Sequence, residues 1–203
     1  QTIYFPEIGT TAKDKETDMN ISHADKEVTL VDTVAYKNLL PGEEYVMTGT
    51  LMDKESGKPV EIDKKEVTAE TTFTPKESSG TVDVIFTFDG TSLAGKTVVV
   101  FESATYDGKE FATHADLEDN GQTIYFPEIA TTAKDEADGD HFAKTDKEVT
   151  IVDTVKYSNL IPGKEYALTG TLMDKETKEP LQADGKPITA TTTFTPEDAS
   201  GSI

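Results

Sequence analysis

Four polar side chains fall on strand faces that the residue pattern assigns to the protein interior: Thr10, Asp32, Glu102 and Gln122. Each alternates with apolar residues two positions away, as Asp32 does with Leu30, and alternate residues of a strand face the same side. A carboxyl group buried without a partner is costly, so it either finds a hydrogen bond or takes up a proton. The four side chains therefore form either a satisfied hydrogen-bond network or a reactive site.

The strands that carry these side chains belong to a long internal repeat. Residues 1–82 align with residues 122–203 without a gap, and 49 of the 82 aligned positions are identical. A period this long is a whole domain rather than one unit of a solenoid. The chain is therefore predicted to hold tandem domains, the second of which has no counterpart of residues 83–121.

Short runs rich in β-branched residues, separated by turn dipeptides such as Pro41-Gly42 and Asp107-Gly108, predict an all-β fold. The expected strands cover residues 28–34, 45–52, 67–74, 82–88, 97–103 and 122–126. No window shows a helical period. Several short strands joined by turns are typical of a β-sandwich.

The repeat also sets the expected domain boundaries. Residues 1–7 are predicted to be the end of an upstream repeat or a linker, and residues 8–125 a complete domain. A short linker is expected at 126–128, followed at 129–203 by an incomplete second repeat that lacks its C-terminal strands.

Composition excludes several classes of function. The chain has 39 Asp and Glu residues against 19 Lys and Arg, a formal net charge of −20, which argues against nucleic acid and anionic membranes as partners. No apolar run is long enough for membrane insertion. The absence of cysteine excludes disulfides and thiolate metal sites. No motif predicts a metal or cofactor, and residues 116–121 are interpreted as a polar turn rather than a calcium loop.

The ordered motifs resemble those of a known family. Ile8–Asp14, Val31–Val34, Val98–Glu102 and His114–Asp116 leading to Gln122 are similar to segments of VaFE-type Ig-like repeat domains. These domains occur in the surface adhesins and stalks of Gram-positive bacteria, where a Thr and a Gln form an intramolecular ester bond. The resemblance covers essentially the whole chain and implies tandem Ig-like β-sandwich domains, the second one truncated.

The resemblance also implies roles for individual residues. Thr10 becomes the nucleophile, Gln122 the electrophile, His114 the base, and Glu102 with Asp32 the acid pair. A Thr hydroxyl needs a base to become nucleophilic, and a protonated carboxyl group can stabilise the charge that develops on the attacked amide. Ammonia leaves, and the reaction occurs once per domain, so it is autocatalytic cross-linking rather than enzyme turnover.

One alternative nucleophile and one difference from the family pattern accompany this assignment. Thr11 is a second candidate nucleophile, but the alternation places it on the face opposite Ile8 and Ala12. The family often has Glu where this chain has Ala115, between His114 and Asp116.

The second repeat keeps only part of the set. Thr131 and Asp153 match Thr10 and Asp32, but no residue of the second repeat corresponds to Glu102, His114 or Gln122. As it stands, this repeat is not expected to form the bond.

The resemblance implies that the chain is a structural stalk repeat of an extracellular, cell-wall-anchored adhesin. Its expected partners are neighbouring repeats of the same chain. Any host ligand is then bound elsewhere in the full protein. Two alternatives stay open: an isopeptide cross-link between Lys and Asn or Asp, and a ligand-binding adhesin module.

Overall fold

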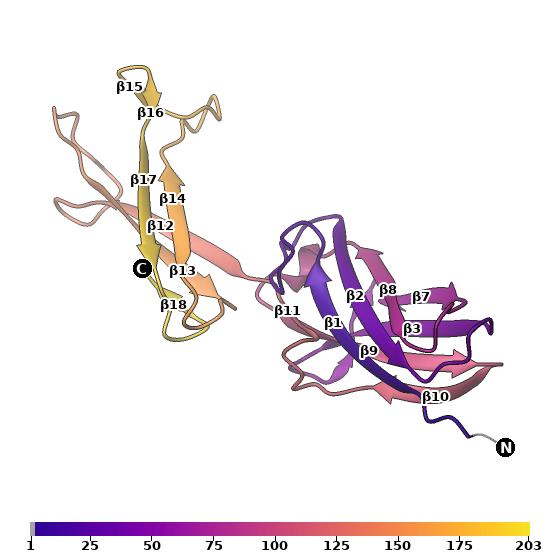
Figure 1. Cartoon of the computed structure of the whole chain (residues 1–203). Helices are drawn as coiled ribbons and strands as arrows, with labels where there is room; N and C mark the ends of the chain where they lie inside the picture. Colours follow the sequence, from indigo (N-terminus) through magenta and orange to yellow (C-terminus); the bar gives the residue numbers. More distant parts are fainter. Residues whose placement is uncertain (1–2) are drawn as a thin grey trace. The chain divides into compact units, whose positions relative to one another are not determined.

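The computed structural model describes residues 3–203, and the chain divides between Pro127 and Glu128 into two compact units (Figure 1). The first unit contains β1 (Glu7–Asp14), β2 (Val28–Lys37), β3 (Tyr45–Asp53), β4 (Lys58–Pro59), β5 (Glu61–Ile62), β6 (Lys65–Glu66), β7 (Thr68–Phe73), β8 (Gly80–Phe88), β9 (Thr97–Tyr106), β10 (Lys109–His114) and β11 (Thr123–Tyr125). Its helical content is one 3₁₀ turn, η1 (Thr91–Leu93). In the described part of the chain, no helix is long and apolar enough to cross a membrane.

Two antiparallel sheets enclose the core of the first unit. One sheet has the order β1-β2-β8, and the other has the order β10-β9-β3-β4, with β7 paired to β3 and β11 paired to β9. Strands β5 and β6 form a small separate hairpin. Inward side chains of both sheets meet in one apolar cluster, which includes Leu30, Val84 and Phe86 from the first sheet and Leu51 and Val98 from the second. The predicted all-β sandwich is confirmed.

The six predicted strands are present, with small shifts at their ends. Strand β11 begins at Thr123 rather than Gln122, because the Gln122 backbone N–H bonds to the Asp119 carbonyl in the preceding turn. Strand β10 was not predicted. Its side chains are mostly exposed or half-buried, and a register shift between Glu110 and Ala112 interrupts the alternation on which the prediction depended.

The linker predicted at residues 126–128 is shorter in the structure. Phe126 is fully buried in the core of the first unit, and its backbone pairs with Lys96 and Gly95. Strand β1 begins at Glu7 and strand β12 begins at Glu128. Both residues, which were predicted to lie in linkers, therefore belong to strands.

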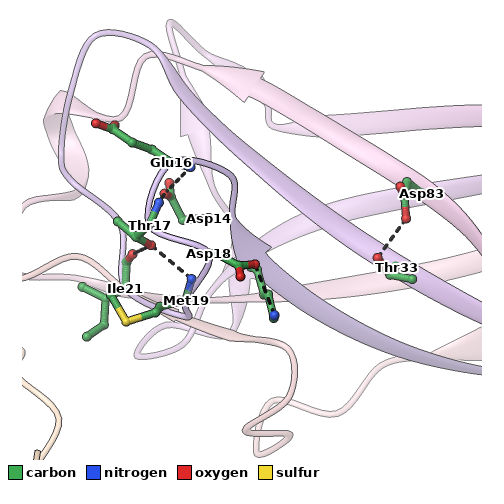
Figure 2. A network of polar contacts seen from close by, with 9 residues as sticks. Asp14, Glu16, Thr17, Asp18, Met19, Ile21, Thr33 and Asp83 are labelled. Atoms are coloured by element: carbon green, nitrogen blue, oxygen red, sulfur yellow. Dashed lines mark hydrogen bonds and ion pairs between the residues drawn. The ribbon is translucent and has the colours of Figure 1, made fainter.

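A loop after β1 holds the last strand in place, and Figure 2 shows its polar contacts. The Asp14 carboxylate accepts hydrogen bonds from the backbone N–H groups of Glu16 and Thr17, at 3.0 and 2.8 Å. The Thr17 hydroxyl donates to the Ile21 carbonyl at 2.6 Å. Ile21 in turn forms a parallel bridge with Tyr125 of β11. The loop therefore helps to fix the strand that follows Gln122.

The second unit contains β12 (Glu128–Asp135), β13 (Ile151–Ser158), β14 (Tyr166–Thr171), β15 (Gln182–Ala183), β16 (Lys186–Pro187), β17 (Thr189–Phe194) and β18 (Gly201–Ser202). These strands pair as β12-β13-β18, β14-β17 and β15-β16. Ile151 is 43% exposed, whereas Leu30, its counterpart in the first unit, is fully buried. Residues 129–203 contain no equivalents of β9, β10 and β11, whose side chains cover the corresponding face in the first unit.

Candidate functional site

Strand pairing brings Thr10 and Asp32 to the inner face of the first sheet. In the pair β1–β2, Thr10 lies opposite Val34 and Ala12 lies opposite Asp32. Asp32 is fully buried, and the Thr10 hydroxyl oxygen is also shielded from solvent. Thr11 is exposed, because successive residues of a strand face opposite sides. Of the two threonines, only Thr10 therefore directs its hydroxyl toward the buried carboxyl group.

Glu102 and His114 come from the second sheet and lie directly opposite each other in the pair β9–β10. Directly opposed residues of an antiparallel pair project from the same face of the sheet. Glu102 is 2% exposed, and the His114 side chain is 27% exposed. The carboxyl group therefore lies in the core and the imidazole at its rim.

Gln122 lies between the two sheets and touches both. Its side-chain amide donates a hydrogen bond from Nε2 to Oδ1 of Asp32 at 3.1 Å. Its backbone carbonyl accepts a hydrogen bond from Val100 of β9 at 3.1 Å. The neighbouring Gly121 carbonyl accepts one from Ala12 of β1 at 2.9 Å. These bonds place the fully buried Gln122 side chain beside the strand that carries Thr10.

Five buried side-chain oxygen atoms have no hydrogen-bond partner in the described part of the chain, and all five belong to these residues. They are Thr10 Oγ1, Asp32 Oδ2, both carboxyl oxygens of Glu102, and Gln122 Oε1. By contrast, the buried Asp14 carboxylate has partners for both of its oxygens. An unpaired buried polar group costs about 1–3 kcal/mol. Glu102 nevertheless interacts with Asp32 and with the Thr10 hydroxyl, so the four side chains form one cluster whose hydrogen-bonding capacity is only partly used.

Burial raises the pKa of both carboxyl groups. The pKa of Glu102 rises to about 10, first because the group is buried and then because Asp32 lies beside it; the nearby Thr10 hydroxyl opposes the rise. Burial also raises the pKa of Asp32, whereas its contacts with Glu102 and Gln122 and the charge of His114 oppose that rise. Two carboxyl groups in one dry site do not ionise together readily. Glu102 therefore keeps its proton at neutral pH and can donate a hydrogen bond.

The raised pKa of Glu102 predicts that folding stability falls as the pH rises. Between the ordinary pKa of 4.5 and the folded-state value of about 10, the folded chain holds a proton that the unfolded chain has lost. The unfolding free energy therefore decreases across this window, and the contribution is lost once the pH exceeds about 10. Urea unfolding of a Thr10→Ala variant at a series of pH values measures the slope without interference from covalent chemistry at Thr10.

The control for this pH series is the double variant Thr10→Ala/Glu102→Gln, which lacks the titrating group. We expect its stability to fall less steeply between about pH 5 and pH 10. Equal slopes for the two variants would show that Glu102 does not hold a proton in the folded state.

His114 has a partner that the sequence did not suggest. Its Nε2 atom lies 2.7 Å from Oδ2 of Asp119. Asp119 belongs to the segment that the sequence predicted as a polar turn, and that prediction is confirmed by a backbone hydrogen bond from Asp119 to the Asp116 carbonyl at 3.2 Å. The sequence held one indication of this contact, because Asp119 lies in the short segment that joins His114 to Gln122.

In the second unit, the counterparts of Thr10 and Asp32 keep the same strand register but are not buried. Thr131 lies opposite Val155 and Ala133 opposite Asp153, which reproduces the pairing of β1 with β2. Both Thr131 and Asp153 are exposed. Residues 129–203 hold no equivalent of the side chains that β9, β10 and the Gln122 segment contribute to the first site.

Lysine is absent from the buried polar side chains of the described residues, which are Asp14, Ser22, Asp32, Glu102, Gln122 and Thr123. A lysine amine becomes a nucleophile when it is desolvated and loses its proton. The buried cluster of Gln122 and the two carboxyl groups therefore contains a threonine hydroxyl and no lysine amine. This geometry favours an ester over the isopeptide alternative.

Fold and site together define the class: a β-sandwich repeat protein in which a buried Gln lies beside the strand that carries Thr10. The chain belongs to the family of T-Q ester bond containing domains, which it matches twice, at residues 6–126 and 127–203. No curated protein matches it.

Solved structures support the fold assignment. The chain is similar to a bacterial adhesin from Mobiluncus mulieris described as containing intramolecular disulfide, isopeptide and ester bond cross-links. In one crystal form the TM-score is 0.53 at 16% identity, covering 94% of this chain and 98% of that one. A second crystal form gives 0.51 at 15% identity, covering 97% and 96%. This chain has no cysteine and cannot form an intramolecular disulfide.

Proposed function

We propose that the first domain cross-links itself through an ester between Thr10 Oγ1 and the side-chain carbonyl carbon of Gln122. The observation that carries the proposal is the set of five unpaired oxygen atoms, which all lie on the four residues that such a reaction uses. The Thr10 O–H bond and the Gln122 C–N bond break, an O–C bond forms, and one molecule of ammonia leaves. No oxidant, metal or cofactor is needed for this balance.

The position and ordinary chemistry of each group support the following roles. Asp32 accepts a hydrogen bond from the Gln122 amide and so orients the carboxamide. Protonated Glu102 supplies a hydrogen bond to the oxygen on which negative charge develops, a role that a neutral acid in an apolar site performs well. His114 takes the Thr10 proton and delivers it to the departing nitrogen. Because the site consumes its own side chains, the domain reacts once.

The proposed bond gives the domain a mechanical role. Thr10 lies on the first strand of the unit and Gln122 lies one residue before the last, β11. Tension applied at the two ends of the domain then passes through the ester instead of through the hydrogen bonds of the sheets. We therefore propose a stalk repeat of an extracellular adhesin, in line with the similarity to the Mobiluncus adhesin. In a chain without cysteine, the ester takes the place of a disulfide.

Intact-mass spectrometry of the whole chain tests the proposal. We expect a mass lower than the sequence mass by one ammonia, and a proteolytic fragment in which the peptide containing Thr10 is joined to the one containing Gln122. Brief alkaline treatment should release the two peptides, because an ester hydrolyses under conditions in which an amide survives. A chain of full sequence mass contradicts the ester, and a link that resists alkali points to an isopeptide.

A further inference from the structure

We propose that Asp14 is a positioning residue for the cross-linking reaction. Through a hydrogen bond to Ser22 it holds strand β11, and with it Gln122, against the strand that carries Thr10. The inference rests on the proposed ester and assigns a function to a buried carboxylate that takes no part in the bond-forming step. Asp14 is 4% exposed and Ser22 is 1% exposed, so both side chains lie inside the domain.

Three hydrogen bonds occupy both oxygens of the Asp14 carboxylate. Oδ1 accepts the backbone N–H groups of Glu16 and Thr17, which closes the turn that follows β1 (Figure 2). Oδ2 accepts the Ser22 hydroxyl at 2.7 Å. A carboxylate accepts stronger hydrogen bonds than a neutral oxygen does. The Asp14 side chain therefore ties the far end of the loop, at Ser22, to the end of β1.

The end of the loop that Asp14 holds is the part that pairs with β11. The Ser22 backbone N–H donates to the Tyr125 carbonyl at 2.9 Å, and the Tyr125 N–H donates to the Asn20 carbonyl at 2.9 Å. Ile21, between them, forms the parallel bridge with Tyr125. Loss of the hydrogen bond between Asp14 and Ser22 is therefore expected to loosen the pairing of β11 with the loop.

Gln122 is held from two sides, and both attachments lead back to β1. On one side, the carbonyl of the preceding residue accepts the Ala12 backbone N–H at 2.9 Å. On the other side, Tyr125 pairs with the loop that Asp14 fixes. Thr10, Ala12 and Asp14 alternate along β1 and share its inner face. Because a displacement of about 1 Å between reacting groups can lower a rate about 10²-fold, both attachments affect the reaction.

The second unit separates the role of the aspartate in the turn from its role toward β11. Asp135, the counterpart of Asp14, accepts the Ala137 backbone N–H at 2.8 Å, so it also closes a turn. The counterpart of Ser22 is Ala143, which has no hydroxyl. Residues 129–203 hold no equivalent of β11. The turn therefore forms without the serine, and the bond to Ser22 occurs in the unit in which a last strand pairs with the loop.

Asp18 provides a charge control within the same loop. Its exposed carboxylate pairs with the Lys13 amine at 3.3 Å, and exposed ion pairs contribute little to stability. Its φ angle is +54°, a conformation that asparagine also adopts. Asp18→Asn therefore removes one negative charge from the loop and leaves the bond between Asp14 and Ser22 in place.

The first test follows ester formation after refolding. The full chain and its variants are isolated unfolded in urea and diluted into buffer in which each is fully folded, and the fraction that has lost ammonia is followed by intact mass. We expect Ser22→Ala and Asp14→Ala each to slow the reaction by at least about 10-fold. Asp18→Asn should react at the wild-type rate. Wild-type rates for both Ser22→Ala and Asp14→Ala would overturn the proposal.

The double variant Asp14→Ala/Ser22→Ala tests whether the two residues act together. It should react no more slowly than Asp14→Ala alone, because both substitutions remove the same hydrogen bond. Slowing equal to the product of the two single effects would show that Asp14 does not act through Ser22.

Amide hydrogen exchange separates positioning from a general loss of stability. In a Thr10→Ala background, Ser22→Ala should accelerate exchange at the Tyr125 N–H at least about 10-fold more than at Leu51, whose N–H bonds to Val67 elsewhere in the core. Equal acceleration at both sites would show that Ser22 acts only through the overall stability of the fold, and would overturn the proposal.

Failure of the ester itself gives a different pattern of results. In that case the wild-type chain keeps its full mass after refolding, whereas hydrogen exchange still reports whether Asp14 and Ser22 hold β11. If the wild-type chain loses ammonia and the variants lose it equally fast, the ester stands and the positioning role is wrong.

Discussion

Replacing Thr10 by alanine should keep the chain at full mass and lower its unfolding free energy by about 4–5 kcal/mol. The ester between Thr10 and Gln122 would close a loop of 112 residues (122 − 10). In the chain-entropy model, a cross-link over a loop of about 100 residues contributes about 4.7 kcal/mol, because it restricts the unfolded state. Typical domains are stable by about 5–15 kcal/mol in total. Chemical denaturation at neutral pH, together with intact mass, measures both effects.

Thr11 supplies the matched control for this experiment. It is also a threonine of β1, but its side chain is exposed. We expect Thr11→Ala to lose ammonia as the wild type does and to change stability by no more than about 0.5 kcal/mol. Thr10→Ser keeps a hydroxyl at the reacting position and should still form the ester. Loss of ammonia in the Thr10→Ala variant would show that another residue is the nucleophile.

Alternation along the strands was sufficient to locate the buried Asp32, Glu102 and Gln122 and the shielded hydroxyl of Thr10, but it did not single out the buried Asp14, Ser22 and Thr123. It succeeded for Asp32 and Glu102 because β2 and β9 are long, pair on both sides, and pair without a register shift through these two positions. Their neighbours Leu30 and Val100 are fully buried, so the face assignment was unambiguous. The repeat also predicted the domain boundaries.

Alternation failed for strand β10 and the turn that follows it. The register shift between Glu110 and Ala112 breaks the period-2 pattern, and the strand lies largely at the surface. The contact of His114 with Asp119 depends on the conformation of a turn, which no periodic pattern encodes. Residues 5 positions apart meet here only because backbone hydrogen bonds from Asp119 and Gln122 close the turn.

The second unit illustrates how closely folding and chemistry are linked in this domain type. Strands β9 and β10 and the segment from Asp119 to β11 supply one side of the core, and they also supply Glu102, His114 and Gln122. Without equivalents of these strands in residues 129–203, Ile151 of β13 and the Thr131–Asp153 pair are exposed. The ester is therefore expected to form only after the final strands of a domain have packed against its core.

Glu102 is the residue at which stability and reactivity are expected to change in opposite directions. In a Glu102→Leu variant, ester formation should slow by about 10²–10³-fold, the effect of removing one hydrogen-bond donor to a developing oxyanion. Leu fills a similar volume and removes two unpaired buried oxygens. Because an unpaired buried polar group costs about 1–3 kcal/mol, the uncross-linked fold should be equally stable or more stable. Refolding rates by mass and unfolding free energies in a Thr10→Ala background measure the two effects separately.

Glu110 provides the control for the Glu102 experiment, because it is an exposed carboxylate on the adjacent strand β10 that accepts a hydrogen bond from Ser103. Glu110→Leu makes the same side-chain replacement at an exposed position and should leave the rate of ester formation unchanged. If Glu102→Leu destabilised the uncross-linked fold by several kcal/mol and reacted at the wild-type rate, the buried carboxyl group would serve the fold alone. Opposite changes in rate and stability are expected only if the domain retains a costly buried acid for its chemistry.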